Sequence, residues 1–157
     1  MKIDIGSKAP DFSLYDSDKN KVTLSELKGQ NVLILFFPQA FTGVCTKQLC
    51  SIRDNIGHYD HINAKVLGIS VDSVFTLAKF KDEQGYNFPL LSDFNKKTST
   101  AYGSIYDSWI LDMNGVSKRS AFIVDKEGII RYAEVLDNAG EIPSFEAIQS
   151  TLASLSL

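Results

Sequence analysis

Six consecutive apolar residues, Val32–Phe37, constrain the fold of this chain more than any other segment. The run is rich in β-forming residues and has the length of a strand, so it predicts a strand buried on both faces, as in a parallel sheet. Pro38 follows directly and ends the strand. From residue 42 or 43 to about residue 62, apolar residues recur at three- and four-residue steps, which predicts a helix.

The rest of the chain predicts further strands and helices in a single domain. We expect a β-hairpin at 12–24, a helical turn at 25–29, strands at 64–71, 120–124 and 129–135, and helices at 73–85, 96–102 and from Pro143 onwards. A right-handed crossover makes the first two core strands parallel, and the tight turn at 125–128 makes the last two antiparallel. A mixed central sheet with helices on both faces and an N-terminal β-hairpin is the thioredoxin-like α/β fold, and 157 residues fit one such domain, residues 1–157.

Composition excludes several functional classes. Lys and Arg total 16 against 19 Asp and Glu, and this net charge of −3 argues against nucleic-acid partners and anionic membranes. The chain has no long apolar run, and its first residues lack a signal peptide's apolar core, so we expect a cytoplasmic protein. Its two cysteines, Cys45 and Cys50, are too few for a disulfide scaffold or a four-ligand zinc site. These thiols are therefore either incidental or chemically active.

Cys45 stands where a strand-end loop enters a helix, and ligands usually bind at this position in open α/β sheets. The unpaired N–H groups and the dipole of a first helical turn stabilise a thiolate over a thiol. The alternative is that Cys45 only fills space as a small apolar residue, which is the commoner role of an isolated cysteine.

The pattern Pro38-x-x-x-Thr42-x-x-Cys45 after an apolar strand resembles the signature of the peroxiredoxin family (alkyl hydroperoxide reductase and thiol-specific antioxidant proteins). The run from Phe36 to Cys45 is most similar to the alkyl hydroperoxide reductase E subgroup. The Cys-x-x-x-x-Cys spacing instead resembles the bacterioferritin-comigratory (thiol peroxidase Q) subgroup. Further matches lie at Ala9–Phe12, Gly68–Ser70, Phe88–Asp93, Ala101–Gly103 and Arg119–Asp125.

The resemblance implies a thiol-dependent peroxidase that works without haem, flavin or metal. Cys45 would attack the peroxide as a thiolate and become a sulfenic acid. Thr42 would hold the peroxide, Pro38 would limit water, and Arg119 would pair with Cys45 and with the departing oxygen. The backbone N–H groups of Val44 and Cys45 would supply further donors to the substrate. Each residue also has a plainer role: Thr42 could cap the helix, Pro38 could only end the strand, and an arginine at a strand start is usually solvated.

Ionisation of the thiol cannot by itself make a fast peroxidase. Free cysteine has a pKa of about 8.5, so about 3% is thiolate at pH 7, and nearly complete ionisation gains only about thirtyfold. Most of the acceleration must come from donors aimed at the charge that develops on the leaving oxygen.

Cys50 is interpreted as a resolving thiol that forms a disulfide with Cys45, although an incidental surface cysteine and a one-cysteine cycle remain alternatives. At about 100° per residue it lies about 140° around the helix from Cys45, on the polar side with Gly57 and His61. Five helical residues rise about 7.5 Å, more than the roughly 7 Å that a disulfide spans between Cα atoms. The first helical turns would therefore have to unwind in each cycle.

The family resemblance also bears on partners. It implies a hydroperoxide substrate and a reductant that is a thioredoxin-like protein, a glutaredoxin-like protein or a low-molecular-weight thiol. Gln48 stands where many members carry Glu, which puts any charge role of that position in doubt. The irregular segment with Tyr106, Trp109, Ile110 and Met113 is either a loop folded over the core or a dimer interface. Related peroxiredoxins often dimerise through this region, which favours a homodimer.

Competing functions fit less well. A disulfide oxidoreductase would need Cys-x-x-Cys, and a cysteine phosphatase would need Arg where Ser51 stands. A peroxide sensor that passes oxidation to a partner protein remains an alternative, and turnover with excess reductant separates it from a peroxidase.

Overall fold

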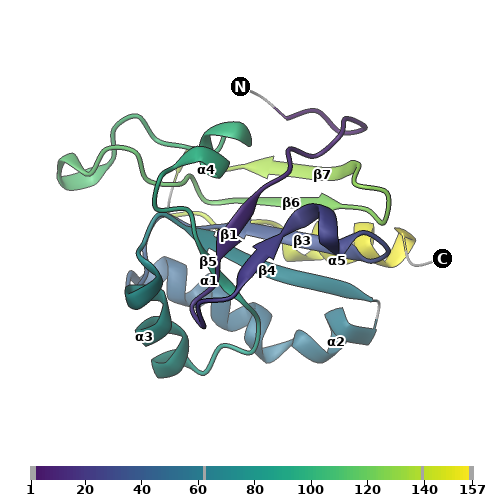
Figure 1. Cartoon of the computed structure of the whole chain (residues 1–157), viewed down its shortest axis with the longest axis horizontal. Helices are drawn as coiled ribbons and strands as arrows, with labels where there is room; N and C mark the ends of the chain where they lie inside the picture. Colours follow the sequence, from purple (N-terminus) through teal and green to yellow (C-terminus); the bar gives the residue numbers. More distant parts are fainter. Residues whose placement is uncertain (1–2, 62, 139, 156–157) are drawn as a thin grey trace.

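The computed structural model describes residues 3–61, 63–138 and 140–155, and the side chains of residues 43–46 are not among those described. Its five-stranded sheet has the order β5-β4-β3-β6-β7 (Figure 1). The strands are β3 (Asn31–Phe36), β4 (Ala64–Ser70), β5 (Leu90–Ser92), β6 (Ser120–Val124) and β7 (Ile130–Val135). The pair β3–β4 is parallel and the pair β6–β7 is antiparallel, which confirms both predictions.

β3 lies at the centre of the sheet, and all six of its residues are buried. Its apolar run therefore faces two separate cores, one on each side of the sheet. One core contains Leu33, Leu35 and side chains from the longer helices. The other contains Val32, Ile34 and Phe36 and is closed by the N-terminal segment and the short helix α4 (Lys97–Ala101).

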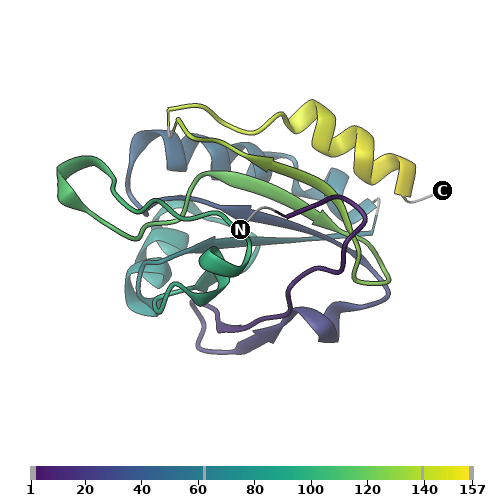
Figure 2. The same ribbon diagram turned by 90° about the horizontal axis from the view of Figure 1, so that it is seen from above.

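The predicted hairpin forms as strands β1 (Ser13–Tyr15) and β2 (Lys21–Thr23), followed by a 3₁₀ helix at Leu24–Leu27. Seen from above, it lies across the sheet from the C-terminal helix α5 (Phe145–Leu155) (Figure 2). Helix α3 (Val74–Gln84) begins and ends as predicted: the Ser73 hydroxyl accepts from the Thr76 N–H, and Gly85 adopts a left-handed conformation.

The long helix predicted at 42–62 divides into α1 (Gly43–Asp54) and α2 (Ile56–His61). The break falls at Asn55, whose side-chain amide donates to the carbonyl of Ser51 (2.7 Å). The backbone N–H of Asn55 bonds to Ile52 instead (3.1 Å). The side chain thus takes the acceptor that the next helical hydrogen bond would use, so the helix ends there.

Two further details differ from the sequence prediction. β5 was not expected, because its three residues are too few to show a strand pattern. α5 begins at Phe145 rather than Pro143, because the Ser144 hydroxyl accepts from the N–H of Ala147 (3.3 Å) and caps the helix there. Within the described residues, no helix is long and apolar enough to span a bilayer.

Candidate functional site

The backbone places Cys45 in the first turn of α1, directly after the segment that leaves β3. Residues 37–42 connect the two elements and are called the active-site loop below. The side chains of Val44 and Cys45 lie outside the described part of the structure, so their predicted roles stay predictions.

Pro38 and Thr42 both lie in the active-site loop. Pro38 is buried, as a water-excluding residue requires. Thr42 is the N-cap residue of α1, but its side chain makes no capping hydrogen bond. Its hydroxyl donates to the carbonyl of Gln39 instead (3.2 Å). Of the two roles weighed for Thr42, side-chain capping of the helix is therefore wrong.

Arg119 reaches the same edge of the sheet from a distant part of the chain. It immediately precedes β6, whose Ser120 pairs with Phe36 at the end of β3. Only 1% of Arg119 is exposed, so the solvated alternative is wrong. Its Nη1 donates to Oε1 of Gln48 on α1 (2.6 Å). A guanidinium held so deeply is a preorganised donor, and its partner Gln48 stands three residues after Cys45 on α1.

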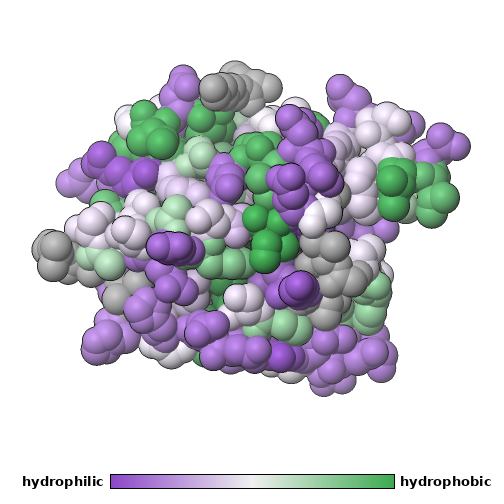
Figure 3. Space-filling view, turned by 180° about the vertical axis from the view of Figure 1, so that it is seen from behind, coloured by the Kyte–Doolittle hydropathy of each residue, from purple (hydrophilic) through white to green (hydrophobic). Residues whose placement is uncertain are grey.

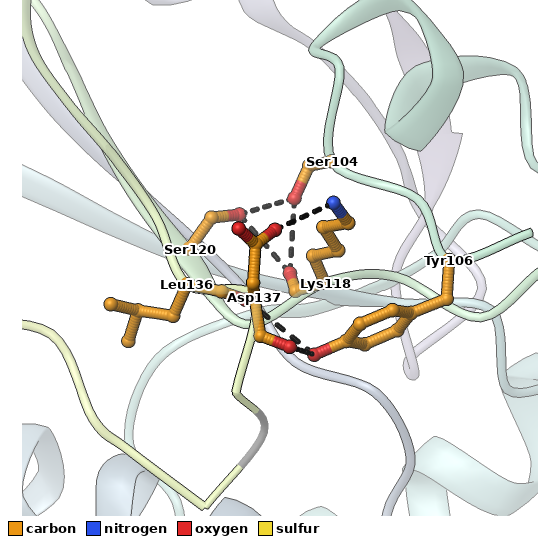
Figure 4. Close-up of polar contacts among 6 residues, drawn as sticks. All are labelled: Ser104, Tyr106, Lys118, Ser120, Leu136 and Asp137. Carbon is orange, nitrogen blue, oxygen red and sulfur yellow. Dashed lines mark hydrogen bonds and ion pairs between the residues drawn. The ribbon is translucent and has the colours of Figure 1, made fainter. Parts of the chain in front are cut away.

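The surroundings of Arg119 fix its backbone on both sides. Its carbonyl accepts from the N–H of Leu136 (2.9 Å). Lys118 pairs with Asp137 (2.8 Å), and the Ser120 hydroxyl hydrogen-bonds that of Ser104 (Figure 4). Because both neighbours of Arg119 are anchored, its side chain starts from a rigid position.

Gln48 is fully buried and faces Arg119. Its Nε2 has no hydrogen-bond partner among the described residues. A buried amide donor without an acceptor is costly, which makes the Gln48 amide a candidate hydrogen-bond donor in this site. Unlike the Glu of many family members, this amide can donate a hydrogen bond but brings no negative charge.

Cys50 does not lie on a polar face, and that prediction is wrong. It is half-buried and packs against the core, and its Sγ lies 3.8 Å from the hydroxyl of Tyr86. The chain after α3 covers this side of α1: Tyr86 is buried, and the Arg53 guanidinium donates to the carbonyl of Gln84. Helical spacing could not reveal this neighbour, because it comes from a different element.

Asp72 is not among the predicted site residues, but it also contacts the active-site loop. Its carboxylate accepts from the backbone N–H of Ala40 (2.7 Å) and from the Ser70 hydroxyl (2.7 Å). Burial raises the pKa of Asp72, although both hydrogen bonds act in the opposite direction. The sequence did contain one indication of this role: Asp72 follows a strand of the parallel part of the sheet, and ligands usually bind at that end of such strands.

The irregular segment forms a projecting loop at the left of Figure 1. Tyr106 and Trp109 stack at 6.2 Å, and the Tyr106 hydroxyl donates to the carbonyl of Asp137 (2.9 Å; Figure 4). The tip exposes Ile110 and Leu111, with 60% and 87% of their surfaces accessible. The base of the loop is therefore fixed, while its apolar tip points away from the domain.

Comparison with known proteins gives consistent matches. The AhpC/TSA family matches residues 5–133. Alkyl hydroperoxide reductase E of Mycobacterium bovis is 37% identical over 156 residues, covering 98% of both chains. The crystal structure of peroxidoxin BcpB from Mycobacterium tuberculosis superposes with a TM-score of 0.84 at 27% identity, over 98% of both chains. The bacterioferritin comigratory protein of Xanthomonas campestris, described with alkyl peroxide reduction activity, gives 0.81 at 26% identity, over 93% of this chain and 92% of that one.

Proposed function

Because the chain belongs to the AhpC/TSA family and is a thiol-dependent peroxidase, we propose that Cys45 is the nucleophile that reduces the peroxide. Its thiolate attacks one oxygen of ROOH, and the O–O bond breaks. Cys45 becomes the sulfenic acid, and the other oxygen leaves as RO⁻ and takes a proton to give the alcohol, or water when R is hydrogen. The cysteine sulfur is oxidised by two electrons and the peroxide is reduced by two.

The observation that supports this assignment most strongly is the burial of Arg119 at the edge where β3 meets the first turn of α1. A fixed positive charge there stabilises both the thiolate and the departing RO⁻. We assign Thr42, Arg119 and the backbone N–H groups of Val44 and Cys45 to peroxide binding. Pro38 limits access of water to the sulfur.

Cys50 is proposed to resolve the sulfenic acid. Its thiolate attacks the Cys45 sulfur, a disulfide forms, and hydroxide leaves to become water. The contact between Cys50 and Tyr86 must then open, and the first turns of α1 must unwind, because five helical residues rise about 7.5 Å. An external dithiol or two thiols reduce the disulfide and restore both cysteines.

The reductant is proposed to be a thioredoxin-like or glutaredoxin-like protein or a low-molecular-weight thiol. A reducing cytoplasm supplies such thiols, so that compartment fits the proposed cycle. A peroxide relay to a partner protein remains the second candidate, because the same sulfenic acid can react with a partner's thiol.

Stopped-flow oxidation tests these assignments. Wild type, Cys45→Ser and Cys50→Ser are mixed with hydrogen peroxide and with an organic hydroperoxide, and each candidate reductant is then added. We expect Cys45→Ser to lose peroxide consumption and Cys50→Ser to retain the first oxidation but not the disulfide. Full activity in Cys45→Ser would overturn the proposal. Turnover of Cys50→Ser with a small thiol, equal to that of wild type, would establish a one-cysteine cycle.

We also propose that the projecting loop mediates a homodimer. Its tip leaves Ile110 and Leu111 exposed, and hydrophobic side chains gather at the corresponding end of the molecule in Figure 3 (right). Exposed apolar side chains on a fixed loop are typical of interaction sites. Sedimentation of wild type and Leu111→Asp tests this: a dimer that becomes monomeric supports the interface, and a monomeric wild type contradicts it.

A further inference from the structure

We propose that Asp72 is a positioning residue for the peroxidase reaction: its carboxylate latches the active-site loop in the conformation that presents Cys45 to peroxide. The inference rests on the proposed role of Cys45. One oxygen, Oδ2, accepts both from the backbone N–H of Ala40 in the loop and from the Ser70 hydroxyl, each at 2.7 Å. Hydrogen bonds to an ionised acceptor are stronger than those between neutral groups.

Asp72 itself is held by the ends of two neighbouring strands. The Ser70 hydroxyl at the end of β4 also accepts from the N–H of Asp72 (3.2 Å). Ser92 at the end of β5 donates its hydroxyl to the carbonyl of Asp72 (2.6 Å). The N–H of Asp93 bonds to the carbonyl of Ser70 (2.7 Å). The latch therefore ties the loop after β3 to a fixed point on β4 and β5.

The loop on the other side of this bond is strained. Phe41, directly after Ala40, has a φ of +66°, which is costly for a bulky side chain. Its ring packs on Phe80 (4.9 Å between centroids), and Phe80 packs on Tyr86 (5.1 Å). Tyr86 is the residue whose hydroxyl lies beside the sulfur of Cys50. Strain at Phe41 thus favours a change in the conformation of the active-site loop, and the Ala40–Asp72 hydrogen bond opposes that change.

Two steps of the catalytic cycle place opposite demands on this loop. Reaction with peroxide requires the first turn of α1 to be folded beside Arg119. Disulfide formation requires the same turn to open. A weaker latch should therefore slow the first step while leaving the second unchanged or making it faster. A substitution that only lowered the overall stability of the protein would not slow the oxidation of Cys45 while leaving disulfide formation unchanged or faster.

The test compares Asp72→Asn with Asp125→Asn. Asp125 is a matched control, because its carboxylate also accepts backbone N–H hydrogen bonds, here from Glu127 and Ile129, but lies in the turn at the far end of β6. Stopped-flow kinetics give the rate of Cys45 oxidation, in wild type and in the Cys50→Ser background. Mass spectrometry under excess peroxide gives the ratio of Cys45 sulfinic acid to Cys45–Cys50 disulfide.

We expect Asp72→Asn to slow Cys45 oxidation about tenfold, the effect of weakening one charge-assisted hydrogen bond. The fraction of sulfinic acid should fall, because the loop opens before a second peroxide reacts. Asp125→Asn should change neither quantity, and Ser70→Ala should give an intermediate result. Equal slowing of both steps, or an unchanged oxidation rate in Asp72→Asn, would overturn the latch. Loss of the proposed function itself is recognised separately, by activity that persists in Cys45→Ser.

Discussion

Replacing Gln48 with Glu tests how the buried charge of Arg119 is used. Gln48 accepts from Arg119 at 2.6 Å as a neutral amide, so glutamate would add an anion to this enclosed site. Gln48 stands three residues after Cys45 on α1, and at this spacing in a helix the Cβ atoms lie about 5–6 Å apart. Two unit charges about 6 Å apart repel by about 2.8 kcal/mol at an effective dielectric constant of 20. That energy corresponds to about two pH units in the ionisation of the thiol.

We therefore expect Gln48→Glu to move the midpoint of the pH–rate profile for Cys45 oxidation upwards by about two pH units. At pH 7 the rate should fall roughly tenfold or more, and at high pH much of it should return. Stopped-flow measurements between pH 5 and pH 9 give both quantities. Gln48→Met is the matched control, since it removes the amide without adding charge and should lower the rate with a smaller change in midpoint. An unchanged midpoint in Gln48→Glu would refute the electrostatic reasoning.

Three further predictions concern other parts of the molecule. Arg119→Ala and Thr42→Val should lose far more peroxidase rate than their measured change in Cys45 thiolate fraction explains; rates that merely follow that fraction would contradict transition-state stabilisation by these donors. Burial acts to raise the pKa of Asp125, but hydrogen bonds from two backbone amides and an arginine outweigh it and lower the pKa. Asp125→Asn should therefore lower the free energy of unfolding by about 1–3 kcal/mol at pH 7. The difference from wild type should shrink below about pH 4, because the carboxylate of the wild-type protein is then protonated and loses its stabilising effect. Gly68→Ala should cost about 1–3 kcal/mol in urea denaturation, because its Cβ would lie 2.8 Å from a buried leucine methyl group.

The core strands could be predicted because each carries its own local signal. β3 and β6 are buried along their whole length and are apolar after their first residue, since both faces of the sheet are covered. The two ends of α3 could also be predicted from nearby residues, since Ser73 caps its beginning and Gly85 supplies the left-handed residue at its end. The break at Asn55 was missed because one side-chain hydrogen bond outweighs an apolar repeat that continues on both sides.

The candidate site was less predictable, because its contacts join distant parts of the chain. Arg119 and Gln48 are separated by 71 positions, and only the family resemblance had indicated that Arg119 belongs to the site. Asp72 and Ala40 are 32 positions apart, and no motif linked them. The environment of Cys50 depends on Tyr86, 36 positions away, so the helical wheel gave the wrong face.

The N-terminus of α1 explains how one helix can serve a rigid step and an opening step in the same cycle. Its N-cap Thr42 makes no side-chain capping bond, and its first turn has no acidic residue to interact with the helix dipole. A missing cap costs about 1 kcal/mol, and a strained backbone such as that of Phe41 costs about 1–3 kcal/mol. Among the described residues, tertiary hydrogen bonds flank this turn on both sides: the Ala40–Asp72 bond lies before it and the Arg119–Gln48 bond after it. Because these contacts lie at the reacting end of the helix, they can open while Leu49 and Ile52 keep the rest of α1 packed in the core.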